Sequence, residues 1–235
     1  MRKVMDKKIF LDLNLESIQG EKKEKFDCFS ALLKEYNTRY NLTSITEDKE
    51  ILYKHFLDSS AAAALFQKNA NVAEVGSGAG FPSIVLKILR EDLCFTLMES
   101  VGKKCEFLRV AVDKLGFKGM NICNIRAEDA AREKEYRERF DYCVARAVAR
   151  MNSLSEYCLP LVKVGGTFIA YKSADETEIQ EAESAYRTLG GRLDFVYGYS
   201  LPEGYGERVL AGVKKIKTTS PKYPRGQGKE RKNPL

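Results

Sequence analysis

Hydrophobic residues in the first 70 positions follow the period of an α-helix. Apolar side chains recur there at steps of three and four, as on one face of an amphipathic helix, at Phe26, Phe29, Leu33, Tyr36 and Tyr40. No strand pattern occurs before Asn71. We therefore expect residues 1–70 to form a helical N-terminal extension.

From Asn71 onward, short apolar runs alternate with amphipathic segments. Runs typical of strands lie at residues 71–76, 94–100, 120–128, 140–148 and 165–172, with helical segments between them. This alternation predicts an α/β, Rossmann-like fold with a doubly wound, mostly parallel sheet.

Two further strands are expected at residues 192–201 and 207–216, where only "PEGYG" separates the apolar runs. A parallel crossover needs about a dozen residues, so these two C-terminal strands should form an antiparallel pair. We expect the sheet domain to span residues 71–216.

Positive charge is concentrated at the C-terminus. The net charge of the 235 residues is +6, and the stretch from Lys214 to Leu235 alone carries +7, from eight basic residues and one acid. A basic terminus containing Pro and Gly is usually a solvated tail, and a phosphate-binding arm is the sharper alternative. We expect residues 217–235 to form such a basic tail.

Composition excludes several classes of protein. Hydrophobic residues make up 44% of the chain and charged residues 31%, as in ordinary globular proteins. No apolar run is long enough to span a membrane or to act as a signal peptide, so we expect no membrane partner and a cytoplasmic location. The six cysteines form no C-x-x-C pair and His55 is the single histidine, so we expect reduced thiols and no metal site.

A glycine-rich loop follows the first predicted strand. The segment "EVGSGAGFP" (74–82) carries Gly76, Gly78 and Gly80, and Glu99 ends the next predicted strand. Ligands of doubly wound sheets bind beyond the carboxyl ends of the strands, near such a loop. A carboxylate at this place can accept hydrogen bonds from both hydroxyls of a ribose. The loop and the acid together favour an adenosine-type ligand over an ordinary tight turn.

The spacing of the loop bears on which adenosine ligand is bound. The dinucleotide fingerprint G-x-G-x-x-G needs a third glycine at position 81, where this chain has Phe81. No G-x-x-x-x-G-K-[ST] phosphate loop is present. The G-x-G-x-G spacing and the antiparallel C-terminal pair favour S-adenosylmethionine over NAD. The alternatives are an NAD-linked oxidoreductase and a non-catalytic RNA-binding protein with a vestigial cofactor fold.

Eight short segments form a series along the chain: "YNLTSI" (40–45), "KHFLDS" (54–59), "EVGSGAGFP" (74–82), "ES..KK..FL" (99–108), "RAE" (126–128), "ARAVA" (145–149), "YK" (171–172) and "KYPR" (222–225). In order and spacing they resemble the bacterial small-subunit ribosomal RNA guanine-N7 methyltransferases, the glucose-inhibited division protein B family. Two departures are mild: Glu74 stands where the family usually has Asp, and Ser83 where many members have Gly.

The resemblance implies a Rossmann-like class I methyltransferase fold that uses S-adenosyl-L-methionine. It implies 16S ribosomal RNA or the small ribosomal subunit as the partner, and N7 of one guanine as the methylated atom. Without the resemblance to the family, Glu128 could equally be a solvent-exposed acid in a loop. The residues expected to bind the cofactor are Gly76, Ser77, Gly78, Phe81, Glu99, Ala127, Glu128 and Arg146.

Arg146 lies just past the fourth predicted strand, where methyltransferases of this fold place residues that handle the acceptor. We expect Arg146 to be catalytic by orienting the acceptor or the cofactor, with a salt bridge at the strand end as the structural alternative. The segment "ARAV" lacks the Asn/Asp-Pro-Pro-aromatic series typical of exocyclic-amine methylation and the Pro-Cys pair of C5-pyrimidine methylation. Guanine N7 needs neither. A 2′-hydroxyl acceptor assisted by Lys172 stays open.

Two groups of residues are expected to contact RNA. His55, Asp58 and Ser59 are expected on one face of a helix. Such an arrangement is poor for a hydrolytic triad, whose members come from different elements. The face either packs on the sheet domain or borders the active site and touches RNA. In the tail, basic side chains and a stacking tyrosine should contact phosphates. The expected set is His55, Asp58, Ser59, Lys172, Lys222, Tyr223 and Arg225. We expect a monomer.

Overall fold

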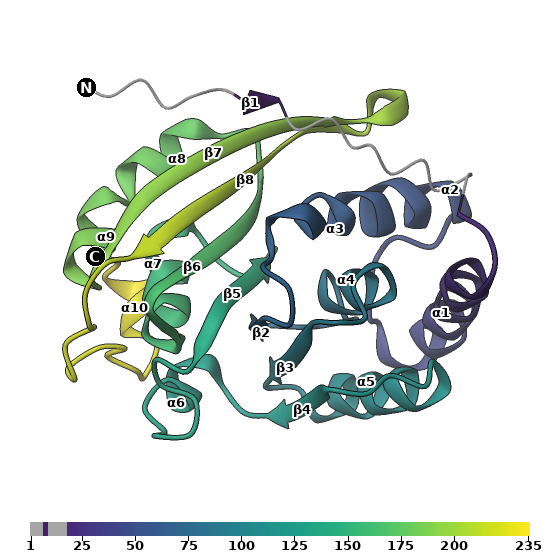
Figure 1. Cartoon of the computed structure of the whole chain (residues 1–235), viewed down its shortest axis with the longest axis horizontal. Helices are drawn as coiled ribbons and strands as arrows, with labels where there is room; N and C mark the ends of the chain where they lie inside the picture. The colour runs from purple at the N-terminus through teal and green to yellow at the C-terminus, as the bar shows by residue number, and fades with distance from the viewer. Residues whose placement is uncertain (1–6, 9–17) are drawn as a thin grey trace.

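The computed structural model describes residues 7–8 and 18–235, and its strands form one eight-stranded sheet (Figure 1). The strands are β1 (Lys7–Lys8), β2 (Asn71–Val75), β3 (Cys94–Glu99), β4 (Met120–Asn124), β5 (Phe140–Arg146), β6 (Val162–Ser173), β7 (Gly191–Leu201) and β8 (Gly206–Lys215). Their order across the sheet is β1-β7-β8-β6-β5-β2-β3-β4. β2 pairs in parallel with β3 on one side and with β5 on the other, so the sheet extends from this strand in both directions.

The predicted α/β fold is confirmed, including its antiparallel C-terminal pair. β8 runs antiparallel to both β6 and β7, and only a short helical turn, η5 (Pro202–Gly204), and Tyr205 connect β7 to β8. The expectation of no strand before Asn71 is wrong at one place within residues 1–70: Lys7 and Lys8 pair in parallel with β7 at Tyr197 and Gly198. Two residues are too few to show a period of two, so the sequence pattern could not reveal this strand.

Helices cover both faces of the sheet (Figure 1). On one face lie α1 (Glu21–Tyr40), α2 (Asp48–Glu50), the π-helical turn η2 (Ile51–Leu57), α3 (Asp58–Ser60), η3 (Ala63–Leu65), α4 (Ser83–Leu89) and α5 (Gly102–Lys114). On the other lie α6 (Ala127–Ala130), α7 (Met151–Cys158), η4 (Leu159–Leu161), α8 (Glu176–Glu181), α9 (Glu183–Thr188) and α10 (Lys229–Lys232). The part of the chain that the structure describes contains no helix with the length and apolarity that crossing a membrane requires.

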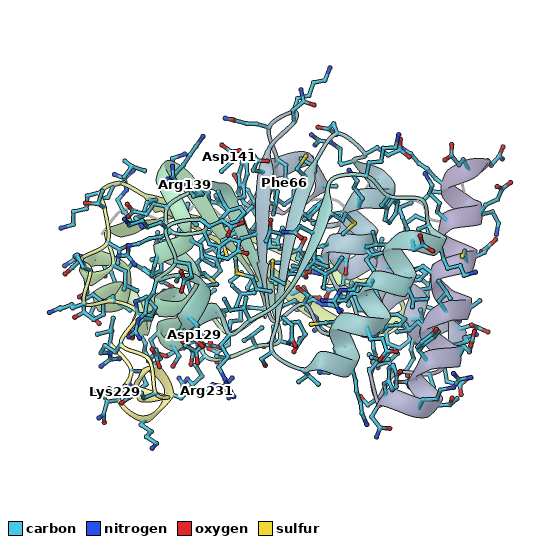
Figure 2. All side chains as sticks on the ribbon, turned by 90° about the horizontal axis from the view of Figure 1, so that it is seen from below. Phe66, Asp129, Arg139, Asp141, Lys229 and Arg231 are labelled. Carbon is cyan, nitrogen blue, oxygen red and sulfur yellow. The ribbon has the colours of Figure 1, made fainter. Side chains whose placement is uncertain are left out.

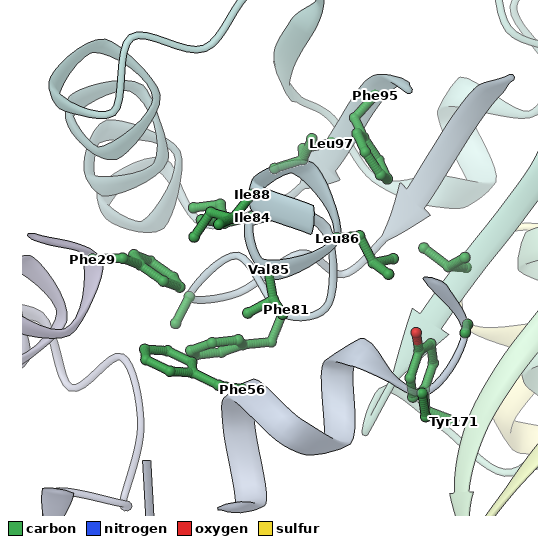
Figure 3. Close-up of a cluster of buried hydrophobic side chains, with 14 of the residues drawn as sticks. Phe29, Phe56, Phe81, Ile84, Val85, Leu86, Ile88, Phe95, Leu97 and Tyr171 are labelled. Carbon is green, nitrogen blue, oxygen red and sulfur yellow. The ribbon is translucent and has the colours of Figure 1, made fainter. Parts of the chain in front are cut away.

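The helical N-terminal extension shares a hydrophobic core with the sheet domain. Phe26, Phe29 and Leu33, from the stripe recognised in the sequence, are buried on α1. The Phe29 ring lies 5.7 Å from the Phe56 ring and 5.3 Å from the Phe81 ring, so α1, η2 and the glycine loop meet in one aromatic cluster (Figure 3). Fully burying side chains of this size contributes about 1.5–3 kcal/mol each, which holds the extension on the sheet.

The basic C-terminal residues also lie against the sheet domain. After β8 the chain passes along α7 and ends in α10 (Figure 1). The Arg137 guanidinium donates to the carbonyls of Thr219 (2.8 Å) and Tyr223 (2.9 Å), and the Arg132 guanidinium donates to the carbonyl of Arg225 (2.7 Å). Because residues 130–140 supply these fixed donors, the segment is docked through its backbone.

Candidate active site

A cavity of about 590 Å³ opens at the carboxyl ends of the central strands. It lies beside β2, the strand from which the sheet extends in both directions, which is where doubly wound folds bind their ligands. Figure 2 shows Asp129 and Arg231 at this end of the molecule, and Phe66 and Asp141 at the opposite end. The cavity is lined by Val75, Gly76, Met98, Glu99, Ser100, Ile125, Arg126, Ala127, Glu128, Asp129, Val148, Tyr157, Gln227, Gly228 and Arg231.

The glycine loop borders the cavity at Gly76, where the backbone packs closely against Val148. Gly76 has a φ of 68° and its N–H donates to the Met98 carbonyl at 2.9 Å, which ties the loop to the end of β3. A Cβ at position 76 would lie 2.7 Å from Cγ2 of Val148, in the loop after β5. Both the backbone angle and the close approach therefore require glycine here.

Glu99 is held at the end of β3 by two backbone donors. Its Oε2 accepts a hydrogen bond from the N–H of Gly78 at 2.9 Å, and its Oε1 accepts one from the N–H of Val101 at 2.8 Å. Each carboxylate oxygen has two lone pairs, so further donors can be accepted on the cavity side. The carboxylate is thus fixed in position and can bind hydroxyl groups of a ligand.

These features fit S-adenosylmethionine. The volume lies within the range of about 300–1,000 Å³ typical of small-molecule sites. A bare glycine backbone forms one wall, the Glu99 carboxylate is an acceptor for a ribose, and Ala127 and Glu128 lie on the wall that follows β4. In residues 7–8 and 18–235, no group of His, Cys, Asp and Glu side chains is placed so that it could hold a metal ion.

The structure brings four of the expected cofactor residues together on the cavity: Gly76, Glu99, Ala127 and Glu128. Gly78 lies behind Glu99 and reaches the cavity only through the hydrogen bond to that carboxylate. Ser77 is buried, and its hydroxyl donates toward the Glu74 carbonyl at 3.5 Å. These two residues shape the loop rather than line the cavity.

Phe81 and Arg146 lie together outside the lining of the cavity. The Phe81 ring packs in the aromatic cluster with Phe29 and Phe56 (Figure 3), and the guanidinium carbon of Arg146 lies 4.9 Å from its centroid. The His55 ring stacks on the same Phe81 ring with centroids 4.3 Å apart. The structure therefore places the side chain of Phe81 in the core between the extension and the sheet.

Arg146 is the centre of a buried polar network. Its Nη1 donates to Oδ2 of Asp58 at 2.9 Å and to the Lys54 carbonyl at 3.0 Å, and its Nη2 lies 3.0 Å from Nδ1 of His55. The side chains of Arg146 and Asp58 are 13% and 7% exposed, so this ion pair is largely removed from water. Tyr199 donates its hydroxyl to Oδ1 of Asp58 at 2.7 Å. The salt bridge weighed as the alternative reading of Arg146 is thus present.

His55 is neutral in this network. Burial, and then the Arg146 charge, lower the pKa of His55 to about 3. Arginine can only donate, so Nδ1 of His55 accepts from Arg146 and the ring proton lies on Nε2. Nε2 then donates to the Thr43 hydroxyl, 2.9 Å away. Both ring nitrogens are therefore occupied inside the protein.

The other residues expected to contact RNA are also engaged internally. Ser59 is fully buried, and its carbonyl accepts a hydrogen bond from the Tyr171 hydroxyl at 2.9 Å. Lys172 donates from Nζ to the Ala149 carbonyl at 2.7 Å and to Oε1 of Glu178 at 2.6 Å. Lys172 therefore holds the loop after β5.

Within the "KYPR" segment, only Lys222 is exposed. Tyr223 is buried, and Arg225 forms an ion pair with the fully buried Glu156, with Nη2 and Oε2 2.8 Å apart. A guanidinium that neutralises a buried carboxylate in this way is a docking contact. The structure thus buries Tyr223, holds the half-buried Arg225 against α7, and leaves Lys222 on the surface.

Sequence reasoning missed the cavity residues that come from the loop after β5, from α7 and from the C-terminal segment. The concentrated positive charge identified the C-terminal segment as unusual, but it gave no sign that this segment lies on the cavity. The lining residues that were not predicted are Val75, Met98, Ser100, Ile125, Arg126, Asp129, Val148, Tyr157, Gln227, Gly228 and Arg231.

A second carboxylate, that of Glu74 on β2, is fully buried behind the glycine loop. In the described part of the chain, neither of its oxygens has a hydrogen-bond partner. Burial raises the pKa of Glu74 to about 7, although the nearby Ser83 and Ser77 hydroxyls oppose this rise. Glu74 therefore titrates near neutrality, with consequences for stability.

Structures solved in complex with AdoMet and with MeSAdo share this fold. M. jannaschii TYW2 in complex with AdoMet has a TM-score of 0.57 at 13% sequence identity, over 74% of this chain and 80% of that one. P. horikoshii TYW2 in complex with MeSAdo has a TM-score of 0.55 at 13% identity, over 68% of this chain and 62% of that one. The chain thus has the fold of a class I methyltransferase.

Sequence comparison then defines the family. A family model described as rRNA small subunit methyltransferase G matches residues 22–203. Relatives named ribosomal RNA small subunit methyltransferase G are 46% identical in Brevibacillus brevis, over 93% of both chains, and 45% identical in Clostridium perfringens, over 92% of this chain and 91% of that one. The chain belongs to this family. The predicted methyltransferase class and its cofactor, S-adenosyl-L-methionine, are confirmed by this membership.

Replacing Glu99 by alanine should weaken binding of the cofactor product, S-adenosylhomocysteine, about tenfold or more. The change removes a charged acceptor, and such hydrogen bonds are worth about 1.5–3 kcal/mol each. Titration calorimetry measures the effect, with Glu106→Ala, an exposed acid on α5, as the matched control. Equal affinities of Glu99→Ala and the wild type would remove Glu99 from the site.

Glu74→Gln should make the free energy of unfolding less dependent on pH. The folded pKa of about 7 lies above the ordinary value of 4.5, so the folded wild type binds more protons between these values and loses stability as pH rises through them. Glutamine does not titrate and lacks this loss. Urea unfolding at about pH 5 and about pH 8 measures the difference, with the exposed Glu24→Gln as the control. Parallel pH dependence in Glu74→Gln and the wild type would contradict the assignment.

Proposed function

We propose that the protein transfers a methyl group from S-adenosyl-L-methionine to N7 of one guanine in the 16S ribosomal RNA of the small ribosomal subunit. The observation that carries this proposal is the match of residues 22–203 to rRNA small subunit methyltransferase G, with the family's glycine loop and Glu99 on one cavity. When bound, S-adenosylmethionine supplies a methyl group attached to a positively charged sulfur.

Guanine N7 suits the residues around the loop after β5. Its lone pair forms the new nitrogen–carbon bond while the sulfur–carbon bond breaks and its electron pair goes to sulfur. No proton leaves N7, so no general base is required. Catalysis then rests on alignment and on the electrostatic environment of the transferred charge.

The side chains nearest this loop support a reaction without a base. His55 is neutral, but its two ring nitrogens are held by Arg146 and Thr43. Lys172 is paired with Glu178, which suits it poorly to activate a ribose hydroxyl. Residues 145–149, "ARAVA", contain no cysteine and no Pro-Pro-aromatic series. These observations favour a ring nitrogen over a 2′-hydroxyl, an exocyclic amine or a pyrimidine C5.

The acceptor must be presented outside a regular helix. N7 faces the deep, narrow groove of A-form RNA, which side chains do not enter. The target guanine is therefore in a loop or turned out of its stack when it reaches the cavity. We infer that the protein works as a monomer in the cytoplasm, on the RNA or on the small subunit.

The product should be a single N7-methylguanosine. Incubation with labelled S-adenosylmethionine and small-subunit RNA or particles, followed by mass spectrometry and strand cleavage at the labile N7-methylated base, identifies the modified atom. The rate should show no steep rise between about pH 6 and about pH 9, because no base must lose a proton first. Methyl groups on a ribose oxygen or an exocyclic amine would contradict the proposal.

We assign Arg146 the role of orienting the acceptor or the cofactor through the N–H groups that its internal partners leave free. Arg146→Ala should lose most methyl transfer. It should also lose up to about 3 kcal/mol of unfolding free energy, because the buried Asp58 loses its nearest cation and keeps only the Tyr199 hydroxyl and the Arg208 guanidinium, whose Nε lies 4.0 Å from Oδ1.

The double variant Arg146→Ala, Asp58→Asn separates these two effects. It should regain stability in urea unfolding yet remain inactive. Recovery of the wild-type rate in the double variant would mean that Arg146 serves only to neutralise Asp58.

A further inference from the structure

The C-terminal segment, residues 219–235, is built into the cavity end of the molecule. Arg132 and Arg137 hold its backbone carbonyls, and the Arg225–Glu156 ion pair fixes it to α7. A second anchor lies further along, where the Ser153 hydroxyl of α7 donates to the Glu230 carbonyl at 2.7 Å. The segment therefore has a defined path across the protein.

This path turns back on itself at its glycines. Gly228 has a φ of 74°, and the buried Glu230 carboxylate accepts a hydrogen bond from the N–H of Gly226. The turn closes the segment into a compact loop over α7. Its inner side presents Gln227, Gly228 and Arg231 to the cavity that Glu99 and Gly76 line from the opposite side.

Arg231 reaches the loop after β5. Its Nη2 donates to the Val148 carbonyl at 3.2 Å. The next carbonyl, that of Ala149, accepts from Nζ of Lys172. The residue before them, Ala147, has a φ of 56°, an uncommon conformation for a residue with a Cβ. Two cationic side chains thus hold consecutive carbonyls of a strained loop.

Val148 connects this restrained loop to the glycine loop. Its side chain occupies the space beside Gly76, where even a Cβ would lie only 2.7 Å away. A shift of Val148 would therefore change the wall of the cavity at Gly76. Arg231, Val148 and Gly76 form a continuous contact from the C-terminal segment to the cofactor side of the sheet.

We propose that the C-terminal segment is a wall of the cofactor cavity and that Arg231 is a positioning residue, which acts on the cofactor site through Val148. This inference rests on the proposed use of S-adenosylmethionine. The sequence predicted a basic arm that contacts RNA phosphates. In the proposed role, the docked segment instead contributes to cofactor binding. Since the ligand contacts a wall that includes the segment, ligand binding and docking of the segment must stabilise each other.

The first test compares Arg231→Ala and Arg231→Lys with Lys229→Ala. Lys229 is an exposed neighbour on α10 whose side chain lies away from Arg231 (Figure 2). Calorimetric affinity for S-adenosylhomocysteine should fall about tenfold in Arg231→Ala, the loss expected for a hydrogen bond from a charged donor. Arg231→Lys should recover part of it, and Lys229→Ala should match the wild type both in affinity and in melting temperature without ligand.

The second readout is independent of activity and affinity. S-adenosylhomocysteine should slow tryptic cleavage after the exposed Lys222 in the wild type, and less so in Arg231→Ala, as followed by mass spectrometry. Equal affinity in Arg231→Ala and the wild type, together with cleavage that the ligand does not slow, would overturn the positioning role alone. Absence of binding by the wild type would overturn the cofactor assignment itself and this inference with it.

Discussion

The loops after β2 and β5 can meet only because residue 76 has no side chain. The two strands are parallel neighbours, so both loops emerge at the same edge of the sheet. Val148 fills the space that a Cβ at position 76 would need. This contact lies on the wall of the cavity, where the glycine loop and the loop after β5 meet. The hydrogen bonds that Arg231 and Lys172 donate to the carbonyls of residues 148 and 149 restrain the same loop.

A second constraint links the helical extension to this edge. Asp58 is buried on α3, and a buried carboxylate is tolerated only with partners that offset its lost hydration. Arg146 from β5 and Tyr199 from β7 supply those partners. The wide π-helical turn before Asp58 directs the Lys54 carbonyl and His55 toward the same guanidinium. Such turns often occur at functional sites, and here one joins the extension to the end of β5.

The sequence was informative where a pattern repeats and uninformative where contacts are distant. The alternation of apolar runs after Asn71 predicted the sheet, and the α1 stripe predicted the extension, because both depend on local periodicity. The position of Gly76 and Glu99 at the cavity could be predicted, because a glycine-rich loop after one strand and an acid at the end of the next form a local sequence motif. The position of residues 219–235 could not, because it depends on single arginines such as Arg137, more than 80 residues away along the chain. Charge marked this segment as basic, yet Arg225 is occupied by a buried acid that no local pattern reveals.

Two glutamates near the ends of adjacent strands show how surroundings assign roles to the same side chain. Glu99 on β3 accepts hydrogen bonds from the N–H groups of Gly78 and Val101 and lines the cavity. Among the described residues, none donates a hydrogen bond to the Glu74 carboxylate on β2, and burial raises its pKa to about 7. The two side chains therefore differ in role: Glu99 is a fixed acceptor on the cavity, and Glu74 is a buried acid whose raised pKa makes the stability of the fold depend on pH.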